Sequence, residues 1–312
     1  MNYLRYAKLG EEAVHGTAVA GAVTVDPESS SLDSPGDQAL FWPGASGLDR
    51  QVAPAPYVMD GDLVVALDDV VAGWILKWLL GANETTGTGP YTHVFTPSRA
   101  PLLTPFTVRL GKDIFEHVFA GCVLDSLQIE VGAEFVKATL GILASKDEKA
   151  ALAGAIAWSE GNIFAPHQVT AEIDSVDASA RVEDLKLSIK NNADLKSGRT
   201  VGSRFARRGY RGALEVTGDL TLSFIDSAEL ERFWGTATGP TSTTLTEFPL
   251  SLNFGTSLVI ELARCVYTAM GQPLAGRDRI VQKGSLRALV TTAGDGPIEA
   301  TLTNDQARYD AV

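Results

Sequence analysis

Few side chains in this chain have the types and spacing that catalysis or metal binding requires. The histidines are far apart and lack the short intervals of metal ligands: His15, His93, His117 and His167. Cys122 and Cys265 form no Cys-x-x-Cys pair and lie in apolar runs, which favours two reduced, buried thiols over a redox or metal role. No phosphate-binding glycine loop, nucleophile elbow or metalloprotease helix motif occurs. The sequence therefore predicts no enzyme, no cofactor and no metal site.

One group of charged side chains does suggest binding. Residues 198–212 place five arginines between glycines, beside Phe205 and Tyr210: Arg199, Arg204, Arg207, Arg208 and Arg211. Such a loop can pair with carboxylates of a neighbouring subunit, remain solvated, or grip nucleic acid by charge and stacking. The formal net charge of −12, from 38 acidic and 26 basic residues, argues against a surface that neutralises phosphates. We predict a subunit contact and keep the solvated loop and the nucleic-acid contact as alternatives.

The bulk composition is that of a globular protein. The chain has 312 residues, of which 45% are hydrophobic and 21% charged. This length allows one large β domain or two domains of ordinary size. The first residues lack the apolar core of a signal peptide, and the most apolar window, residues 64–80, is too short and too charged to span a bilayer. We therefore expect a soluble protein with no membrane segment.

Most of the chain has the period-two pattern of antiparallel strands with one buried face. The clearest case is residues 213–224, whose apolar residues alternate with polar ones: Leu214, Val216, Leu220, Leu222 and Phe224. Residues 123–131, 136–142 and 183–190 alternate in the same way. Two short helices interrupt the strands, at residues 68–81 and 226–235. Each begins with aspartate and ends with glycine, as helix caps favour. The sequence therefore predicts a mainly β fold with two helices.

The order of these elements repeats. Each copy contains a strand with Gly-Asp-Leu, a capped helix, a Gly/Thr/Pro-rich loop and a pair of strands that reaches a cysteine; the copies span residues 61–122 and 218–265. From the phenylalanine that opens the strand pair to the cysteine, the spacing is 16 residues in the first copy and 17 in the second. An Ala/Lys/Glu-rich stretch separates the copies. We therefore expect two tandem domains, residues 1–150 and 151–312, with a long irregular loop at 26–60 in the first.

Several segments resemble the tail tube proteins of long-tailed, siphovirus-type bacteriophages. In the second half these are residues 187–192, 208–226, 258–266, 276–282 and 298–304, together with the end of the second helix at Phe233 and Trp234; in the first half they are residues 10–18, 92–97 and 119–127. The similarity covers most of the chain as many weak matches with no single diagnostic motif. Residues 289–297 depart from the family pattern, since they contain a freer Thr-Thr-Ala-Gly-Asp-Gly insert.

The resemblance implies a β-sandwich or split-barrel tube domain with a flanking helix. Inner sheets of such domains join between subunits into a β-barrel around a lumen, and rings of them stack into a tube. Family rings usually contain six tube domains, so two per chain imply a trimeric ring with pseudo-sixfold symmetry; a hexamer of chains is the alternative. Strands with a polar face can line a wet channel, and neighbouring subunits would cover their exposed edges.

The resemblance also implies partners and a location. DNA passes through the lumen without specific binding, which suits an acidic protein. The tape measure protein and the tail tip and terminator proteins are expected partners, and the protein is made in the host cytoplasm and resides in the phage tail. The loop at 26–60, with Trp42 and Arg50, is expected to reach an adjacent ring. Residues 303–312 would form a C-terminal arm, and Arg204, Arg207, Arg208 and Arg211 would contact a neighbouring subunit.

Other functions remain open at this point. A distal tail or tail-terminator protein would form one ring and not stack. A carbohydrate-binding β-sandwich adhesin would need a concave aromatic patch, but three of the five tryptophans fall on the predicted helices, where burial in the core is favoured. A hydrolase that uses dispersed carboxylates is the remaining alternative.

Overall fold

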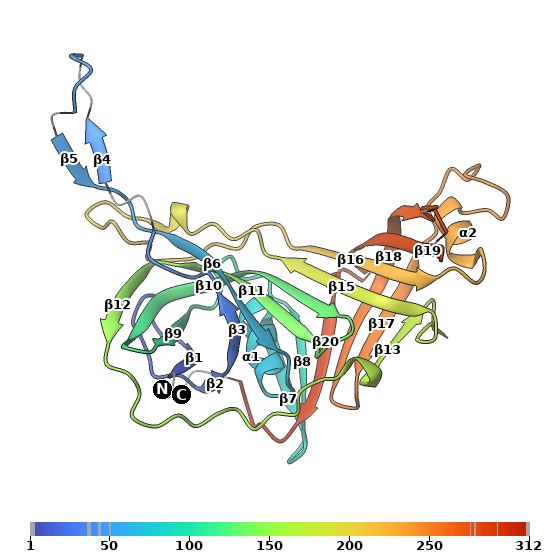
Figure 1. Ribbon diagram of the computed structural model, residues 1–312, viewed down its shortest axis with the longest axis horizontal. Helices are drawn as coiled ribbons and strands as arrows, with labels where there is room; N and C mark the ends of the chain where they lie inside the picture. Colours follow the sequence, from blue (N-terminus) through green and yellow to red (C-terminus); the bar gives the residue numbers. More distant parts are fainter. Residues whose placement is uncertain are drawn as a thin grey trace.

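A computed structural model describes residues 4–35, 39–42, 45–49, 51–274, 276–277, 279–291 and 293–309. The chain forms antiparallel strands and two α-helices (Figure 1). In chain order the elements are β1 (Arg5–Glu11), β2 (Val23–Val25), β3 (Pro27–Ser30), β4 (Ala39–Trp42), β5 (Gln51–Pro54), β6 (Met59–Ala66), α1 (Val71–Leu80), β7 (Gly81–Thr86), β8 (Tyr91–Pro97), β9 (Phe106–Lys112), β10 (Phe115–Val131), β11 (Lys137–Ala144), β12 (Lys146–Ala150), β13 (Val169–Ile173), β14 (Val176–Asp177), β15 (Val182–Lys190), β16 (Glu215–Ser223), α2 (Ala228–Trp234), β17 (Phe248–Phe254), β18 (Leu258–Gly271), β19 (Val281–Ala288) and β20 (Glu299–Asn304). The predicted mainly β fold with two helices is confirmed.

Eight of these strands form one continuous antiparallel sheet across both halves of the chain. Its order is β3-β6-β11-β10-β15-β16-β19-β18. We call it the eight-stranded sheet. One face packs on the core through alternating residues, among them Leu63, Leu140, Leu127, Leu187, Leu220 and Leu286. The other face is polar, as expected for an antiparallel sheet with one solvated side.

Two long strands, β10 and β18, link this sheet to the rest of the fold. The first half of β10 pairs with β9 and β12, and its second half pairs with β11 and β15. The first half of β18 likewise pairs with β17 and β20, and its second half with β19. Cys122 faces Phe106, and Cys265 faces Phe248. The same pairing order therefore occurs in both halves, with β1-β9-β10 matched by β13-β17-β18.

Local sequence explains both helices. Asp68 Oδ1 accepts hydrogen bonds from the amides of Val70 and Val71, and Gly81 adopts the left-handed conformation that ends α1. Helix α1 is buried almost throughout, and the ring of Trp78 stacks on Phe106 with centroids 4.5 Å apart. Helix α2 ends at a left-handed glycine in the same way.

Helix α2 is held by charges. Its buried Glu229 accepts hydrogen bonds from Arg181 (3.2 Å) and the Tyr267 hydroxyl (2.9 Å), and it pairs with Arg232 at 3.2 Å. One sequence expectation is wrong here: Phe224 is 41% exposed, because β16 ends at Ser223 and the chain turns toward the helix before that side chain reaches the core.

Two segments leave the packed body of the fold. Strands β4 and β5 form a separate two-stranded hairpin that projects from one side (Figure 1). The segment expected to separate the two copies begins as β12, which pairs with β10, and continues as an extended connection to β13.

Within the described ranges, no helix has the length and apolar character needed to cross a lipid bilayer.

Candidate assembly surfaces

The eight-stranded sheet ends in two unpaired edges. Inside it, Leu127 of β10 lies between Leu140 of β11 and Ile189 of β15. The equivalent second half of β18 pairs with β19 alone, for example Met270 with Gly284, and its other edge faces no strand of the described chain. At the opposite end, β3 pairs with β6 and with no other strand among the described residues. Open strand edges are templates for pairing with another chain, and proteins usually cover them.

The polar face of this sheet carries nearly balanced charge. Its outward positions include seven acidic and five basic side chains: Glu28, Asp60, Asp62, Glu130, Asp184, Glu215, Asp219, Lys137, Lys186, Lys190, Lys283 and Arg287. Several are paired across strands. Lys186 Nζ lies 3.1 Å from a carboxylate oxygen of Glu130, and Arg287 Nη2 lies 3.2 Å from one of Glu215. The face is therefore hydrophilic without a strong field of either sign.

The β4–β5 hairpin exposes large apolar side chains. Leu40, Phe41, Trp42, Leu48 and Val52 are each between 55% and 69% exposed. Its two strands pair with each other at four positions and with no other described strand. Two-stranded hairpins are marginal in water, and exposed apolar patches mark interaction sites. The hairpin is therefore a surface that binding to another protein would stabilise.

The base of the hairpin is tied down at both ends by Asp147 of β12. The Ser34 hydroxyl donates to this carboxylate from before the hairpin, and the Tyr57 hydroxyl donates from after it at 2.7 Å. His117 Nε2 lies 2.9 Å from the same carboxylate. Although burial raises the pKa of Asp147, these hydrogen bonds hold it below its usual value. The hairpin thus projects from a fixed base.

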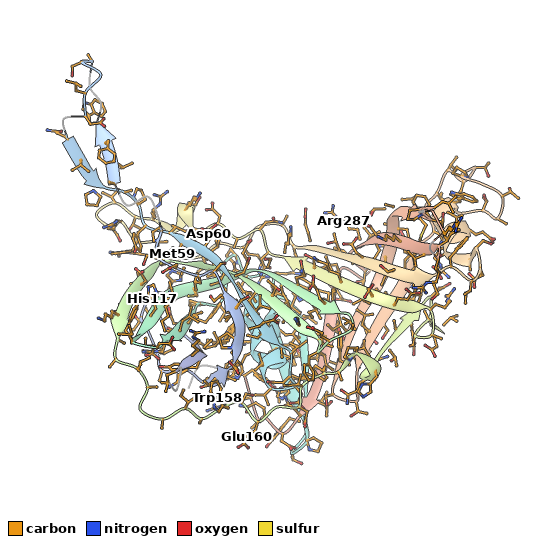
Figure 2. All side chains as sticks on the ribbon, in the orientation of Figure 1. Met59, Asp60, His117, Trp158, Glu160 and Arg287 are labelled. Atoms are coloured by element: carbon orange, nitrogen blue, oxygen red, sulfur yellow. The ribbon has the colours of Figure 1, made fainter. Side chains whose placement is uncertain are left out.

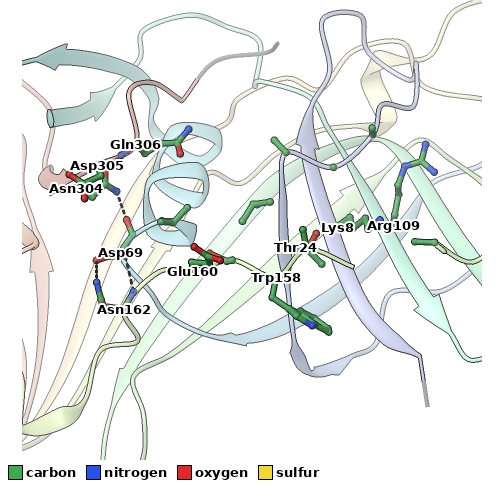
Figure 3. Close-up of a pocket in the computed structure, with 18 of the residues that line it drawn as sticks. Lys8, Thr24, Asp69, Arg109, Trp158, Glu160, Asn162, Asn304, Asp305 and Gln306 are labelled. Carbon is green, nitrogen blue, oxygen red and sulfur yellow. Dashed lines mark hydrogen bonds between the residues drawn. The ribbon is translucent and has the colours of Figure 1, made fainter. Parts of the chain in front are cut away.

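A groove of about 1160 Å³ lies on the opposite side of the molecule from the hairpin (Figure 2), and Figure 3 shows side chains that line it. It is lined by the small residues of the connection after β12, by Trp158, and by polar groups of β1, β9 and the chain after β20. Asp69 closes one end, where its carboxylate accepts from Asn162 N (2.9 Å) and Nδ2 (3.0 Å). Asn304 Nδ2 donates to the Asp69 carbonyl at 2.6 Å. Hydrogen bonds therefore brace one end of the groove.

A comparison with known protein families matches residues 57–305 to the family described as phage tail tube protein. The chain belongs to that family. No curated protein matches the chain. The tail tube protein is therefore a structural component of the virion tail that assembles with other copies into a tube, and it is not an enzyme. Family membership removes the adhesin and hydrolase alternatives.

The structure of the tail tube protein divides the predicted contact arginines into two groups. Arg211 is bound within its own chain: its Nη atoms donate to the carbonyls of Leu79 (3.3 Å) and Leu80 (3.1 Å) at the end of α1 and to Asn191 Oδ1 (3.0 Å). Burial lowers its pKa. By contrast, Arg207 and Arg208 are exposed. Arg211 therefore holds the fold, whereas the exposed pair is free to meet a neighbour.

Two of the remaining predicted contact residues are described: Trp42 lies on the hairpin, and Arg204 lies at its base. Trp42 is 69% exposed on β4, and Arg50 lies outside the described residues. The guanidinium of Arg204 lies 4.9 Å from the centre of the Tyr57 ring, and the Arg204 carbonyl accepts from the Tyr57 amide at 2.9 Å. The predicted arm at the C-terminus is, as far as described, packed against the first half, because Tyr309 is fully buried beside Trp74.

Sequence reasoning missed the β18 edge and the groove. The sequence held no signal for the edge, because it depends on which strand lies beside each long strand: β10 has β15 as a neighbour, whereas the equivalent part of β18 has none among the described strands. The groove had a weak signal in the alternating alanines of residues 151–157, which indicate an extended segment of small residues.

Proposed function

We propose that the chain carries two tandem tube domains, residues 1–150 and 151–312, and that three copies close a ring through their sheet edges. The free edge of β18 would pair with β3 and the residues that follow it in the next copy. A long, siphovirus-type tail of stacked rings with a DNA-conducting lumen would follow from this arrangement. The lumen would hold the tape measure protein until DNA passes through it. The two ends of the tube would contact the tail tip and terminator proteins.

The observation that carries the proposal is the junction between β10 and β15. It joins the two halves edge to edge, with Ser126 opposite Lys190 and Val131 opposite Leu185. Because the cysteines and bulges of β10 and β18 are 143 positions apart, residues 126–131 correspond to residues 269–274. The second half of β18 is thus the counterpart of the second half of β10, whose edge is paired with β15 inside the chain.

The other partner in the junction also has a counterpart. The Gly-Asp-Leu of β6 and that of β16 align Gly61 with Gly218. Leu187 of β15 lies opposite Gly218, and Leu32 lies directly against Gly61, with its Cα 2.6 Å from where a Cβ on that glycine would stand. Both leucines are buried. Residues 30–35 therefore correspond to residues 185–190, and they can pair with residues 269–274 of the next copy.

The size of the closed barrel favours three copies over six. Three eight-stranded sheets contribute 24 strands; at a spacing of about 4.8 Å and a tilt of about 40°, they close at a backbone diameter of about 48 Å. Inward side chains reduce this to about 38 Å, which passes a DNA duplex with room for water. Six copies would double the backbone diameter to about 96 Å, which is far wider than the duplex needs.

A disulfide scan tests both the edge and the register. Gln128 lies opposite Ser188 in the internal junction, and their counterparts are Gly271 and Asp33. Both positions have room for a new side chain, because Asp33 is exposed and a Cβ on Gly271 would meet nothing within 4 Å. The double variant Asp33→Cys, Gly271→Cys should crosslink between copies under mild oxidation and yield a covalent three-chain ring. The native cysteines are buried and do not compete.

The matched control pairs Gly271→Cys with Glu28→Cys. Glu28 is exposed on β3, five residues out of register, or about 16 Å, which is beyond the reach of a disulfide. Each variant loses the pair of an exposed carboxylate with a lysine, Asp33 with Lys112 or Glu28 with Lys137. Asp33→Cys also removes a carboxylate 3.6 Å from His117 Nδ1, but pairs of this kind at exposed sites contribute about 0–1 kcal/mol, so the two stabilities should be close. Absence of crosslinking in the first variant, or equal crosslinking in both, would refute the proposed edge. A covalent product of six chains would show that the ring is a hexamer of chains and not a trimer.

A further inference from the structure

We propose that the β4–β5 hairpin of each copy docks in the groove beside residues 151–160 of a second copy of this chain, in the next ring. This inference rests on the tube assembly proposed above. It specifies which surface of one ring receives which segment of the other, and it gives the tube a direction.

The hairpin lacks what a stable sheet needs. It has one pairing, from Ala39 opposite Pro54 to Trp42 opposite Gln51, so each strand has an open edge. Its exposed apolar side chains include Phe41 (62%), Trp42 and Val52 (64%). Pairing with a third strand would satisfy one edge and bury some of these side chains together.

The groove offers an extended segment that also lacks a partner. Along residues 151–158, among the described contacts, the amide of Ala153 alone finds an acceptor, the Tyr6 hydroxyl at 2.9 Å. Regular bonding resumes where Ser159 N donates to the Thr24 carbonyl at 2.8 Å. Strand addition to such a segment uses main-chain hydrogen bonds for affinity and side-chain contacts for specificity. The segment is therefore fitted to receive another strand.

Side chains around this segment suit an aromatic, flat guest. Ala155 and Ala157 are exposed and small, so a strand can approach their backbone closely. Trp158 is 46% exposed at the groove and offers an indole face (Figure 3). Aromatic pairs contribute stabilisation beyond the area they bury, and Trp42 of the hairpin is of the matching type.

The two surfaces face away from each other on one molecule. Met59 and Asp60, at the base of the hairpin, lie on one side of the body, and Trp158 and Glu160, at the groove, lie on the other (Figure 2). Contacts between unlike surfaces of identical subunits are heterologous, and when they do not close on themselves they generate an open filament. Each ring would therefore present hairpins on one face and grooves on the other.

Two surface variants test this contact. In the hairpin variant, Phe41→Ser and Trp42→Ser remove the apolar side chains. In the groove variant, Ala155→Arg and Ala157→Arg block the approach of a strand. All four positions are exposed, so the fold should persist. A control variant, Val176→Ser with Leu245→Ser, removes exposed apolar side chains elsewhere.

Each variant is also made with Asp33→Cys and Gly271→Cys, so that covalent three-chain rings report ring closure separately from stacking. Both surface variants should form these rings, yet need at least about tenfold more protein than the control to form tubes in electron micrographs. Loss of the rings themselves would count against the ring proposal and not against the docking contact.

Mixing preformed rings of the two variants gives the sharpest result. The intact hairpins of the groove variant can enter the intact grooves of the hairpin variant, but the outer surfaces of such a pair are both disabled. We expect stacks that stop at two rings. Tubes of normal length from either variant alone would overturn the proposal. So would a defect confined to the hairpin variant, which would place the hairpin on another hairpin or on a different tail protein.

Discussion

Replacing Arg211 by alanine should destabilise the folded subunit rather than weaken its assembly. Its guanidinium lies at the carboxyl end of α1, where it donates to Leu79, Leu80 and Asn191. A cation at that position complements the helix dipole, which contributes about 0.3–1 kcal/mol at exposed sites and about 2 in partly buried ones. Loss of the side chain also leaves Asn191 Oδ1 without its donor, at about 1–3 kcal/mol if it stays dry. The Leu79 and Leu80 carbonyls still accept from Asn191 Nδ2 (2.9 Å) and Ser98 N (2.7 Å).

Two effects reduce that total. Water can enter the space that Arg211 leaves and rehydrate Asn191 Oδ1, and the variant no longer needs to desolvate a guanidinium. We therefore expect a loss of about 2 kcal/mol in the free energy of unfolding, within a range of about 1–3. Arg207→Ala, at an exposed position of the same loop, should change it by less than about 0.5 kcal/mol.

Urea unfolding of unassembled protein at low concentration measures both values. Fluorescence of Trp74 and Trp78 is a suitable signal, because these side chains are buried on the helix whose end Arg211 binds. The reasoning fails if Arg211→Ala unfolds at the urea concentration of the parent protein but no longer forms rings. That outcome would place Arg211 at the subunit contact and not at the helix end.

Buried groups give three further predictions. Burial lowers the pKa of His15 to about 4, below its unfolded value of about 6.5, so stability is constant above pH 7 and falls as pH decreases through that interval. After a discount for partial exposure, His15 should lower the free energy of unfolding by about 1 kcal/mol at pH 5 relative to pH 7. Unfolding measured at several pH values should show that His15→Gln lacks this loss. Gly73→Ala should expel the Tyr309 ring, because the new Cβ would overlap it; unfolding should become easier by about 2 kcal/mol, and the C-terminal residues should become protease-sensitive. Glu229→Gln should cost about 2–4 kcal/mol, seen as a lower thermal midpoint, because two guanidinium groups lose a buried carboxylate.

Local patterns predicted the elements of this fold well. Alternation of apolar residues identified β15, β16 and the second half of β10, and aspartate and glycine caps placed both helices within a few residues of their ends. These signals are local, since a side chain's face depends on its own strand or turn. The error at Phe224 has the same origin: the period continues in the sequence past the point where the strand ends.

The assembly surfaces depend on contacts between distant residues, so no local pattern contains them. Pairing of β10 with β15 joins residues about 60 positions apart, for example Leu127 with Ile189. The groove combines Lys8, Trp158 and Asn304, which come from three separate parts of the chain. The exposed hairpin was foreseeable as an irregular loop, but its two strands were not, because four residue pairs give too short an alternation to recognise.

Charge on the polar sheet face changes the explanation of how DNA could slide through the proposed tube. The acidic excess of the whole chain, −12, suggested repulsion from the wall. Yet the outward positions of the eight-stranded sheet carry seven acidic and five basic groups, so most of the excess lies on other surfaces. Three of the five cations on this face are paired with carboxylates: Lys137 with Glu28, Lys186 with Glu130 and Arg287 with Glu215. A lysine already paired at 3.1 Å has less to gain from a phosphate, so a wall of such pairs weakens adhesion locally without a strong repulsive field.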